Sequence, residues 1–221
     1  MAPIEAIVFD FDGVIVDSEP LYEKAEKELF ASYGVDIKIE DLKDTKGLSE
    51  KMYLSIIRKR YNITAPMEEM ILKGRAILKK DFALELNYIP GFPEFYNKIS
   101  PQVKPGLATS SSRDLLNWIF DKTQIRNHFR WSVTADDVVY SKPHPEPYLK
   151  ICHLMGVKPE NAIVIEDSAN GLQSAMAAGA VTIGFLSGSS QDDFPDADYR
   201  ALDYKQVEAL IMAIIEQKKD K

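Results

Sequence analysis

The chain has 221 residues, with 27 Lys and Arg against 34 Asp and Glu and a formal net charge of −7. That length is typical of one domain, or of one domain with a smaller companion. The composition, 45% hydrophobic and 28% charged, is that of a globular protein and excludes a disordered or fibrous chain. The acidic balance argues against nucleic acid and anionic membranes as partners, because both favour a basic surface.

Three further features predict a cytoplasmic location. No apolar run approaches the ~20 residues that span a bilayer. The first residues lack the basic segment and the small-residue cleavage site of a signal peptide. Cys152 is the single cysteine, so no disulfide can form within the chain, as is typical of a reducing compartment. We expect a protein without membrane contacts, and a monomer by default.

The first part of the chain reads as one strand followed by helices. The apolar run at residues 4–11 (IEAIVFDF) ends in acidic residues and predicts a buried strand. Amphipathic spacing then predicts helices over residues 19–33, 49–61 and 66–86, with no convincing strand between 17 and 86. The cluster PGFP at 90–93 is a breaker that ends this helical segment.

Strands and helices alternate in the rest of the chain. Strands are predicted over 103–109, 131–134, 162–165, 181–185 and 197–202, and helices over 114–122, 145–155, 172–178 and 204–217. Such alternation is typical of a parallel sheet with helices on both faces. We therefore predict an α/β fold: a doubly wound parallel-sheet core formed by residues 1–16 and 88–221, with a helical domain, residues 17–87, inserted after the first strand.

Polar side chains gather at the predicted carboxyl ends of the strands, where doubly wound sheets bind ligands. The set, with a lysine that precedes a predicted helix, is Asp10, Asp12, Thr109, Ser110, Lys142, Glu166 and Asp167. If the alternation is interpreted correctly, these groups converge. Together they supply carboxylates for a metal, hydroxyls and a lysine for phosphate oxygens, and a spare carboxylate for proton transfer. Phosphoryl transfer requires this combination.

Each of these residues also has an ordinary structural explanation. Asp12 can belong to an Asp-Gly turn. Ser111 and Asp114 match a helix capping box. Lys142 can be a surface lysine in a loop stiffened by prolines, and Asp167 can be a helix N-cap. No single one of these signals is decisive.

Taken in order, the motifs resemble those of the haloacid dehalogenase-like superfamily, and most closely its β-phosphoglucomutase-like phosphatases. The motifs are DFDGVIVDS at 10–18, Thr109 after Leu-Ala, Lys142 in Ser-Lys-Pro, and EDS at 166–168 followed by Gly171. The likeness covers nearly the whole chain. The helical insertion after the first motif resembles the cap domain of that family.

The resemblance implies a role for each acidic residue. Asp10 would be the nucleophile that accepts the phosphoryl group. Asp12 would protonate the leaving oxygen, then activate water, and offer its backbone carbonyl to Mg²⁺. Asp167 would bind Mg²⁺ together with Asp10, and Glu166 would be a ligand or an outer neighbour.

Further residues would hold the substrate. Thr109 and Lys142 would bind the phosphoryl oxygens, helped by the backbone N–H of Ser110. Residues 45–50 resemble the substrate-contacting loop of the cap, so Lys46 either reaches the substrate or is an ordinary solvated lysine.

The implied activity is that of a Mg²⁺-dependent phosphatase. It would act through an aspartyl-phosphate on a small phosphorylated metabolite, with a sugar phosphate as first choice. A β-phosphoglucomutase-type phosphomutase is the main alternative. Mutases of this subgroup use a His and an Arg where this chain, in an ungapped register, has Tyr22 and Glu50, which favours hydrolysis. The other alternative is a non-enzymatic phosphate-binding or signalling protein on the same core.

Overall fold

Six parallel strands form the central sheet of the computed structural model, which describes residues 3–186 and 197–219. Their order is β3-β2-β1-β4-β5-β6, and every neighbouring pair is parallel. The strands are β1 Ala6–Phe9, β2 Lys104–Ala108, β3 Trp131–Val133, β4 Ala162–Glu166, β5 Val181–Phe185 and β6 Tyr199–Ala201. The sheet grows outward from β1 in both directions, which confirms the predicted doubly wound α/β fold.

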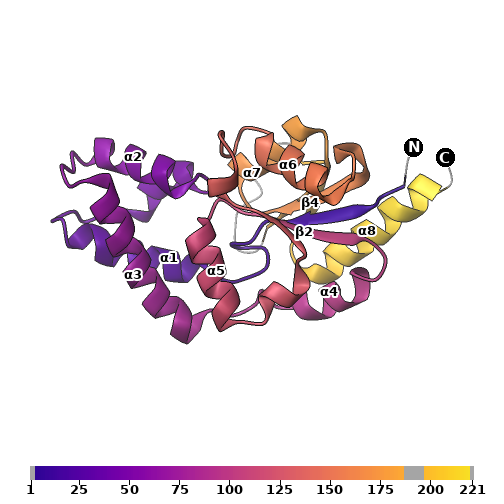
Figure 1. Cartoon of the computed structure of the whole chain (residues 1–221), viewed down its shortest axis with the longest axis horizontal. Helices are drawn as coiled ribbons and strands as arrows, with labels where there is room; N and C mark the ends of the chain where they lie inside the picture. The colour runs from indigo at the N-terminus through magenta and orange to yellow at the C-terminus, as the bar shows by residue number, and fades with distance from the viewer. Residues whose placement is uncertain (1–2, 187–196, 220–221) are drawn as a thin grey trace.

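Helices cover both faces of the sheet, so its central strands are buried on two sides. In β1, Ile7 and Phe9 point into one apolar cluster, whereas Ala6 and Val8 point into the other. Figure 1 shows α6 and α7 on one side of the sheet and α4 and α8 on the other. The core helices are α4 Phe92–Ile99, α5 Arg113–Lys122, α6 Glu146–Met155, α7 Ala169–Ala178 and α8 Tyr204–Lys219.

A separate helical lobe, which we call the cap, lies at the far end of the molecule from the two termini (Figure 1). It contains α1 Glu19–Ala31, α2 Glu50–Arg60, α3 Met67–Glu85 and a 3₁₀ helix Ile39–Thr45. Its own apolar cluster includes Phe30, Leu54, Ile57 and Met70. As expected, no strand occurs between residues 19 and 85, all of which the structure describes.

The chain enters and leaves the cap at one place. The Asp17 N–H donates to the Asn87 carbonyl at 2.9 Å, and Val16 pairs with Tyr88 in an isolated β-bridge. This pairing supports domain boundaries near residues 16–17 and 87–88, which stay a prediction.

Two local details differ from the expectation. The PGFP cluster follows the last helix of the cap, as predicted, but it also begins α4, which was not predicted. Gly91 adopts φ 87° at the N-cap and a proline follows in the first turn, where its missing N–H costs nothing. The predicted capping box of Ser111 and Asp114 is also absent. Ser112 is the N-cap of α5, and its hydroxyl accepts from the Leu115 N–H at 3.3 Å.

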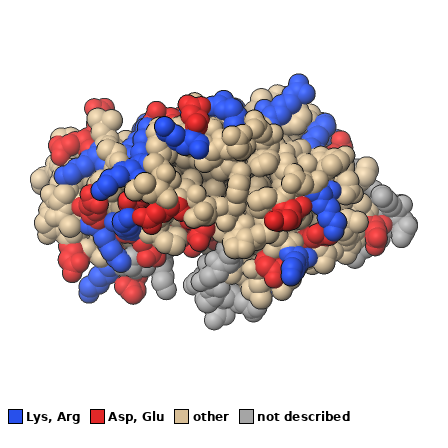
Figure 2. Space-filling model, turned by 90° about the horizontal axis from the view of Figure 1, so that it is seen from below, with Lys and Arg blue, Asp and Glu red and all other residues tan. Residues whose placement is uncertain are grey.

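Both charges are mixed on one face of the molecule. On the face seen in Figure 2, Lys and Arg are interspersed with Asp and Glu, most densely over the cap. Among the helices in the described ranges, none is both long and apolar enough to cross a membrane.

Candidate active site

The predicted site residues converge at the carboxyl edge of the sheet. Asp10 and Asp12 follow β1, Thr109 follows β2, and Asp167 follows β4. Because β1 lies between β2 and β4, these strand ends are neighbours. The Asp10 N–H donates to the Ile165 carbonyl at 3.0 Å, so the β1–β4 ladder continues into the site.

Lys142 is a buried cation in the floor of the site. Its side chain is 2% exposed, and its Nζ lies 2.6 Å from Asp10 Oδ1, 2.5 Å from Glu166 Oε1 and 3.2 Å from the Ala108 carbonyl. Burial alone would lower its pKa, but the charges of Asp10 and Glu166 outweigh burial and raise that pKa well above the usual value. The alternative of a solvated surface lysine is therefore wrong.

Glu166 is the last residue of β4 and is fully buried beside Lys142. Besides Lys142, it accepts hydrogen bonds from the Tyr148 hydroxyl at 2.8 Å and from the Ser168 N–H and hydroxyl at 3.0 and 2.9 Å. Burial raises the pKa of Glu166, but Lys142 and these donors lower it below its usual range. A Cβ on Gly171 would lie 1.8 Å from Glu166 Oε1, so this backbone approach requires glycine.

Asp10, Glu166 and Asp167 form a buried acidic cluster in which one carboxylate oxygen from each residue lies within 4.8 Å of the other two. Gly13 packs against it with φ 73°, and a Cβ there would lie 2.0 Å from Asp167 Oδ2. Burial raises the pKa of Asp10 well above its usual range, against the opposing charge of Lys142. Burial likewise raises the pKa of Asp167 to about 7, although Lys46 opposes it. Clustered carboxylate oxygens are the donors that Mg²⁺ prefers, so this cluster fits that ion.

Asp12 is held by hydroxyls rather than by a cation. Ser18 donates to its Oδ1 at 2.7 Å, and Ser111 donates to its Oδ2 at 3.0 Å. The Tyr22 hydroxyl from the cap lies 3.3 Å from the Ser111 hydroxyl. Burial raises the pKa of Asp12, while the bonds from Ser18 and Ser111 oppose the rise. The Asp12 carboxylate is not in the acidic cluster of the described chain, and a metal contact through its backbone stays a prediction.

The predicted phosphate-binding residues lie beside the acidic cluster. Thr109 is buried, and its hydroxyl accepts from the Ser111 N–H at 3.0 Å. The Ser110 hydroxyl donates to the Gly47 carbonyl of the cap at 2.7 Å. Ser110 is therefore positioned at the junction of core and cap, one residue after Thr109.

Lys46 reaches the acidic cluster from the cap. Its Nζ lies 2.9 Å from Asp167 Oδ2 and also pairs with Glu19, and its carbonyl accepts from the Asn170 amide at 2.8 Å. Burial would lower the pKa of Lys46, but Asp167 and Glu19 raise it above its usual value. Lys46 is therefore not an ordinary solvated lysine, because it contacts a predicted metal ligand, and its contact with the substrate stays a prediction.

Several residues of the site had no role in the sequence prediction. Ser18 and Ser168 fall inside the quoted motifs, so those motifs were the available signal for them. Tyr148 has no comparable signal, because its hydroxyl reaches Glu166 from the first turn of α6 only after folding.

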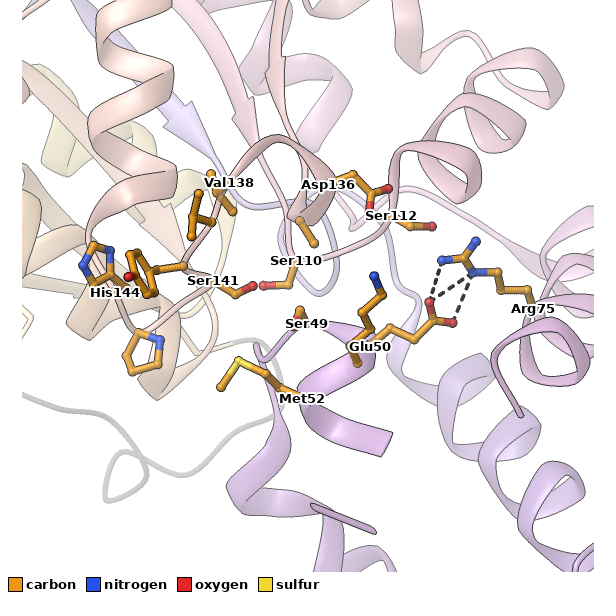
Figure 3. Close-up of a pocket in the computed structure, with 15 residues that line it drawn as sticks. Ser49, Glu50, Met52, Arg75, Ser110, Ser112, Asp136, Val138, Ser141 and His144 are labelled. Carbon is orange, nitrogen blue, oxygen red and sulfur yellow. Dashed lines mark hydrogen bonds and ion pairs between the residues drawn. The ribbon is translucent and has the colours of Figure 1, made fainter. Parts of the chain in front are cut away.

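A cavity of about 660 Å³ opens between the cap and the core beside Ser110. Figure 3 shows Ser49, Ser110 and Ser141 near its centre, with Glu50 and Arg75 on one side. Asp10 and Asp12 are not among the residues that line it. The cavity therefore adjoins the buried carboxylates and does not contain them.

Comparisons with known proteins agree with this geometry. A family model for haloacid dehalogenase-like hydrolases matches residues 7–185. Hexitol phosphatase B of Escherichia coli (strain K12) is 33% identical over 195 residues, which cover 86% of this chain and 87% of that protein. The phosphorylated carbohydrates phosphatase of Thermotoga maritima is 34% identical over 179 residues, covering 80% and 82%. The crystal structure of β-phosphoglucomutase from Clostridium difficile shares the fold, with a TM-score of 0.85 and 23% identity over 99% of this chain and 100% of that chain. The chain is thus an enzyme of the haloacid dehalogenase-like hydrolase family.

Proposed function

We propose that this enzyme is a Mg²⁺-dependent phosphatase that hydrolyses a small sugar phosphate through an aspartyl-phosphate on Asp10. The observation that carries the proposal is the buried cluster of Asp10, Lys142, Glu166 and Asp167, with Asp12 and Thr109 beside it. Two of its curated relatives are a hexitol phosphatase and a phosphatase of phosphorylated carbohydrates, which supports the substrate class.

Asp10 is suited to attack phosphorus. One of its oxygens is bound by Lys142 at 2.6 Å, which fixes the carboxylate and opposes the rise in its pKa that burial causes, and a bound Mg²⁺ would oppose that rise further. In the first step the other Asp10 oxygen bonds to phosphorus while the ester P–O bond breaks. Lys142 and Thr109 would neutralise and orient the phosphoryl oxygens, because this reaction depends mainly on positioning and charge.

Asp12 is suited to carry the proton. Burial raises its pKa, so it can hold a proton for the leaving oxygen in the first step. In the second step its carboxylate takes a proton from water, the water oxygen bonds to phosphorus, and the bond to Asp10 breaks. Inorganic phosphate leaves, and Asp12 is protonated again. Ser18 and Ser111 hold the carboxylate in one orientation for both transfers.

Asp10 and Asp167 would hold Mg²⁺, which supplies positive charge that reduces repulsion between carboxylate and phosphate. Glu166 already accepts from three side chains, Lys142, Tyr148 and Ser168, so we assign it to orienting Lys142 rather than to the first coordination sphere. The backbone at Gly13 packs against the Asp167 side chain, and the backbone at Gly171 packs against the Glu166 side chain, which keeps both carboxylates in place.

Hydrolysis fits this chain better than phosphomutase chemistry. The positions that match the His and Arg of the mutases hold Tyr22 and Glu50. Tyr22 contacts Ser111, and Glu50 is paired with Arg75 at 2.7 Å. Neither side chain is a cation, so neither replaces the His or the Arg of the mutases at a bisphosphate intermediate.

The direct test is phosphate release from a panel of hexitol and hexose phosphates, with Mg²⁺ and with a chelator. Wild type is expected to release phosphate only with the metal. Asp10→Asn is expected to lose more than about 10³-fold in kcat, while circular dichroism shows an unchanged fold. Conversion of β-glucose 1-phosphate to glucose 6-phosphate without phosphate release would instead favour the mutase. Near-wild-type hydrolysis by Asp10→Asn would overturn the role of Asp10.

A further inference from the structure

The cavity beside Ser110 has a charged pair in its wall that the proposed chemistry does not use. Arg75 of α3 donates through Nε to both Glu50 oxygens at 3.2 and 3.0 Å, and through Nη2 to Oε2 at 2.7 Å (Figure 3). Its Nη1 lies 3.8 Å from Asp114 of the core helix α5. The guanidinium is thus held by Glu50 in the bidentate geometry that suits Arg, and Asp114 is a more distant ion-pair partner.

This pair lies on the leaving-group side of the site. The general acid Asp12 connects through Ser111 to Tyr22, at 3.0 and 3.3 Å. Burial and the charge of Asp12 raise the pKa of Tyr22, and the charge of Glu50 raises it further. Glu50 therefore acts on Tyr22, which is linked to Asp12 through the Ser111 hydroxyl, and it lines the same cavity as Ser110. A substrate tail that extends from the leaving oxygen toward α2 would meet Glu50.

The charges in the cavity wall balance. Besides His144 at its rim, the acidic and basic residues that line it are two carboxylates, Glu50 and Asp136, and two cations, Lys51 and Arg75. Asp136 also accepts from the Arg113 N–H at 2.8 Å, at the start of α5. The centre is formed by serine hydroxyls (Figure 3). Such a wall can bind sugar hydroxyls, whereas a second phosphate requires surplus positive charge.

We propose that Glu50 is a specificity-determining residue: by occupying Arg75 it makes the cavity selective for phosphate monoesters with an uncharged, hydroxylated tail. A bisphosphate would place its second phosphate near the Glu50 carboxylate, with Arg75 unable to reach it. The inference rests on the proposed function for the position of the ester phosphate. It adds which substrates of that class the enzyme accepts and which it rejects.

The test measures binding separately from turnover. Calorimetry with Mg²⁺ compares a hexitol monophosphate and the corresponding 1,6-bisphosphate on the Asp10→Asn background, which leaves the substrate intact. This background alone is expected to bind the monophosphate more tightly. Adding Glu50→Gln frees Arg75 and is expected to strengthen bisphosphate binding by about tenfold, as a gained charged hydrogen bond would. Monophosphate binding should change less than about twofold, because the tail stays neutral.

Two further variants separate this effect from a general change in charge. Adding Arg75→Gln to Glu50→Gln restores the balance and should remove the gain. Glu68→Gln removes a negative charge from an exposed position on α3, outside the cavity, and should leave both affinities unchanged. An unchanged bisphosphate affinity in Glu50→Gln, an equal gain in the double variant, or binding of neither ester would each overturn the proposal.

Failure of the proposed function gives a different result. Wild type would then release no phosphate from any monoester, while the Asp10→Asn series would still report the selectivity of the cavity by binding. Where wild type does turn over, the same variants give a second readout. Glu50→Gln should raise the ratio of kcat/KM for bisphosphate over monophosphate by a similar factor.

Discussion

Two lysines reach the acidic cluster, one from the core and one from the cap, and they differ in almost every physical respect. Lys142 has a side chain 2% exposed and is bound by Asp10 and Glu166. Lys46 has a side chain 34% exposed and pairs with Asp167 and Glu19. The first belongs to a network of buried charges that forms as the core folds. The second is attached to a cap loop, so its contact can be broken without disturbing the sheet. Lys142 thus fixes the carboxylates of the site as part of the core, whereas Lys46 contacts them from the cap that covers the site.

The largest expected effect is that of Lys142→Met. It leaves Asp10 and Glu166 buried without their cation, which typically costs about 3–5 kcal/mol of stability. Hydrolysis should fall below detection because the phosphoryl oxygens lose a donor. Urea unfolding and phosphate release measure the two effects. A loss of stability below about 1 kcal/mol would show that the core network is no tighter than a surface pair.

The cap contains a half-buried carboxyl, Glu26, without a comparable cation among the described residues. Burial raises the pKa of Glu26 to about 7. The Tyr53 hydroxyl opposes this rise, and the charge of Glu23 adds to it. The Tyr53 hydroxyl is itself buried and makes no well-aligned hydrogen bond among the described residues. The folded chain holds the Glu26 proton up to about pH 7, whereas an unfolded Glu releases it near 4.5. Stability is therefore lost as the pH rises from about 4.5 to about 7.

Glu26→Gln should remove this loss. The difference in unfolding free energy between variant and wild type should favour the variant at pH 8 by at most about 3 kcal/mol, and should vanish near pH 4. Urea unfolding at the two pH values measures it. Equal differences at both would mean that Glu26 titrates alike in the folded and unfolded chain.

Replacing a glycine of the core, with a glycine of the cap as control, is expected to give the next smaller change in stability. Gly171→Ala places a Cβ 1.8 Å from Glu166 Oε1, so the carboxylate must move and the stability should fall by about 2 kcal/mol, together with activity. The matched control is Gly74→Ala in α3 of the cap, where the nearest atom is 3.2 Å away in the Leu29 side chain. Inside a helix, replacing Gly by Ala typically increases stability by about 0.5–1 kcal/mol. Thermal unfolding of the two variants compares their stabilities, and equal changes would contradict the close contact at Gly171.

The smallest effect is expected for Lys46→Met. A partly exposed ion pair contributes less than about 1 kcal/mol, so stability should hardly change. Mg²⁺ should bind a few-fold more tightly, because a cation that pairs with Asp167 is removed. Calorimetry with the metal alone measures this, with Lys46→Arg as the charge-conserving control. Weaker Mg²⁺ binding would mean that Lys46 orients Asp167 for the ion.

The alternation of apolar strands and amphipathic helices was sufficient to predict the sheet and its class, because periodicity is a local property of the chain. The α4 helix was missed because the same Gly and Pro residues that end helices also begin them. A helix begins here because Phe92 and Phe95 become buried against α8 and the sheet in the folded chain.

The site could be predicted where its residues fall in short motifs at strand ends. Asp10, Asp12, Thr109, Glu166 and Asp167 were identified in this way, and the structure brings them together at neighbouring strands. Which hydroxyl caps α5 and which one holds Asp12 could not be read from a run of four polar residues. Ser112 caps α5 and Ser111 holds Asp12, and a shift of the helix start by one residue would reverse these roles.

By itself, then, the sequence determined the parallel core, the order of the motifs and the chemical types available at the sheet edge, all of which are encoded in local patterns. Only the tertiary structure decided that Lys142 is buried, that Lys46 reaches Asp167 and that Glu50 occupies Arg75. Burial and charge pairing depend on segments that are distant along the chain, and the energy of a charge is set by the groups that fold around it.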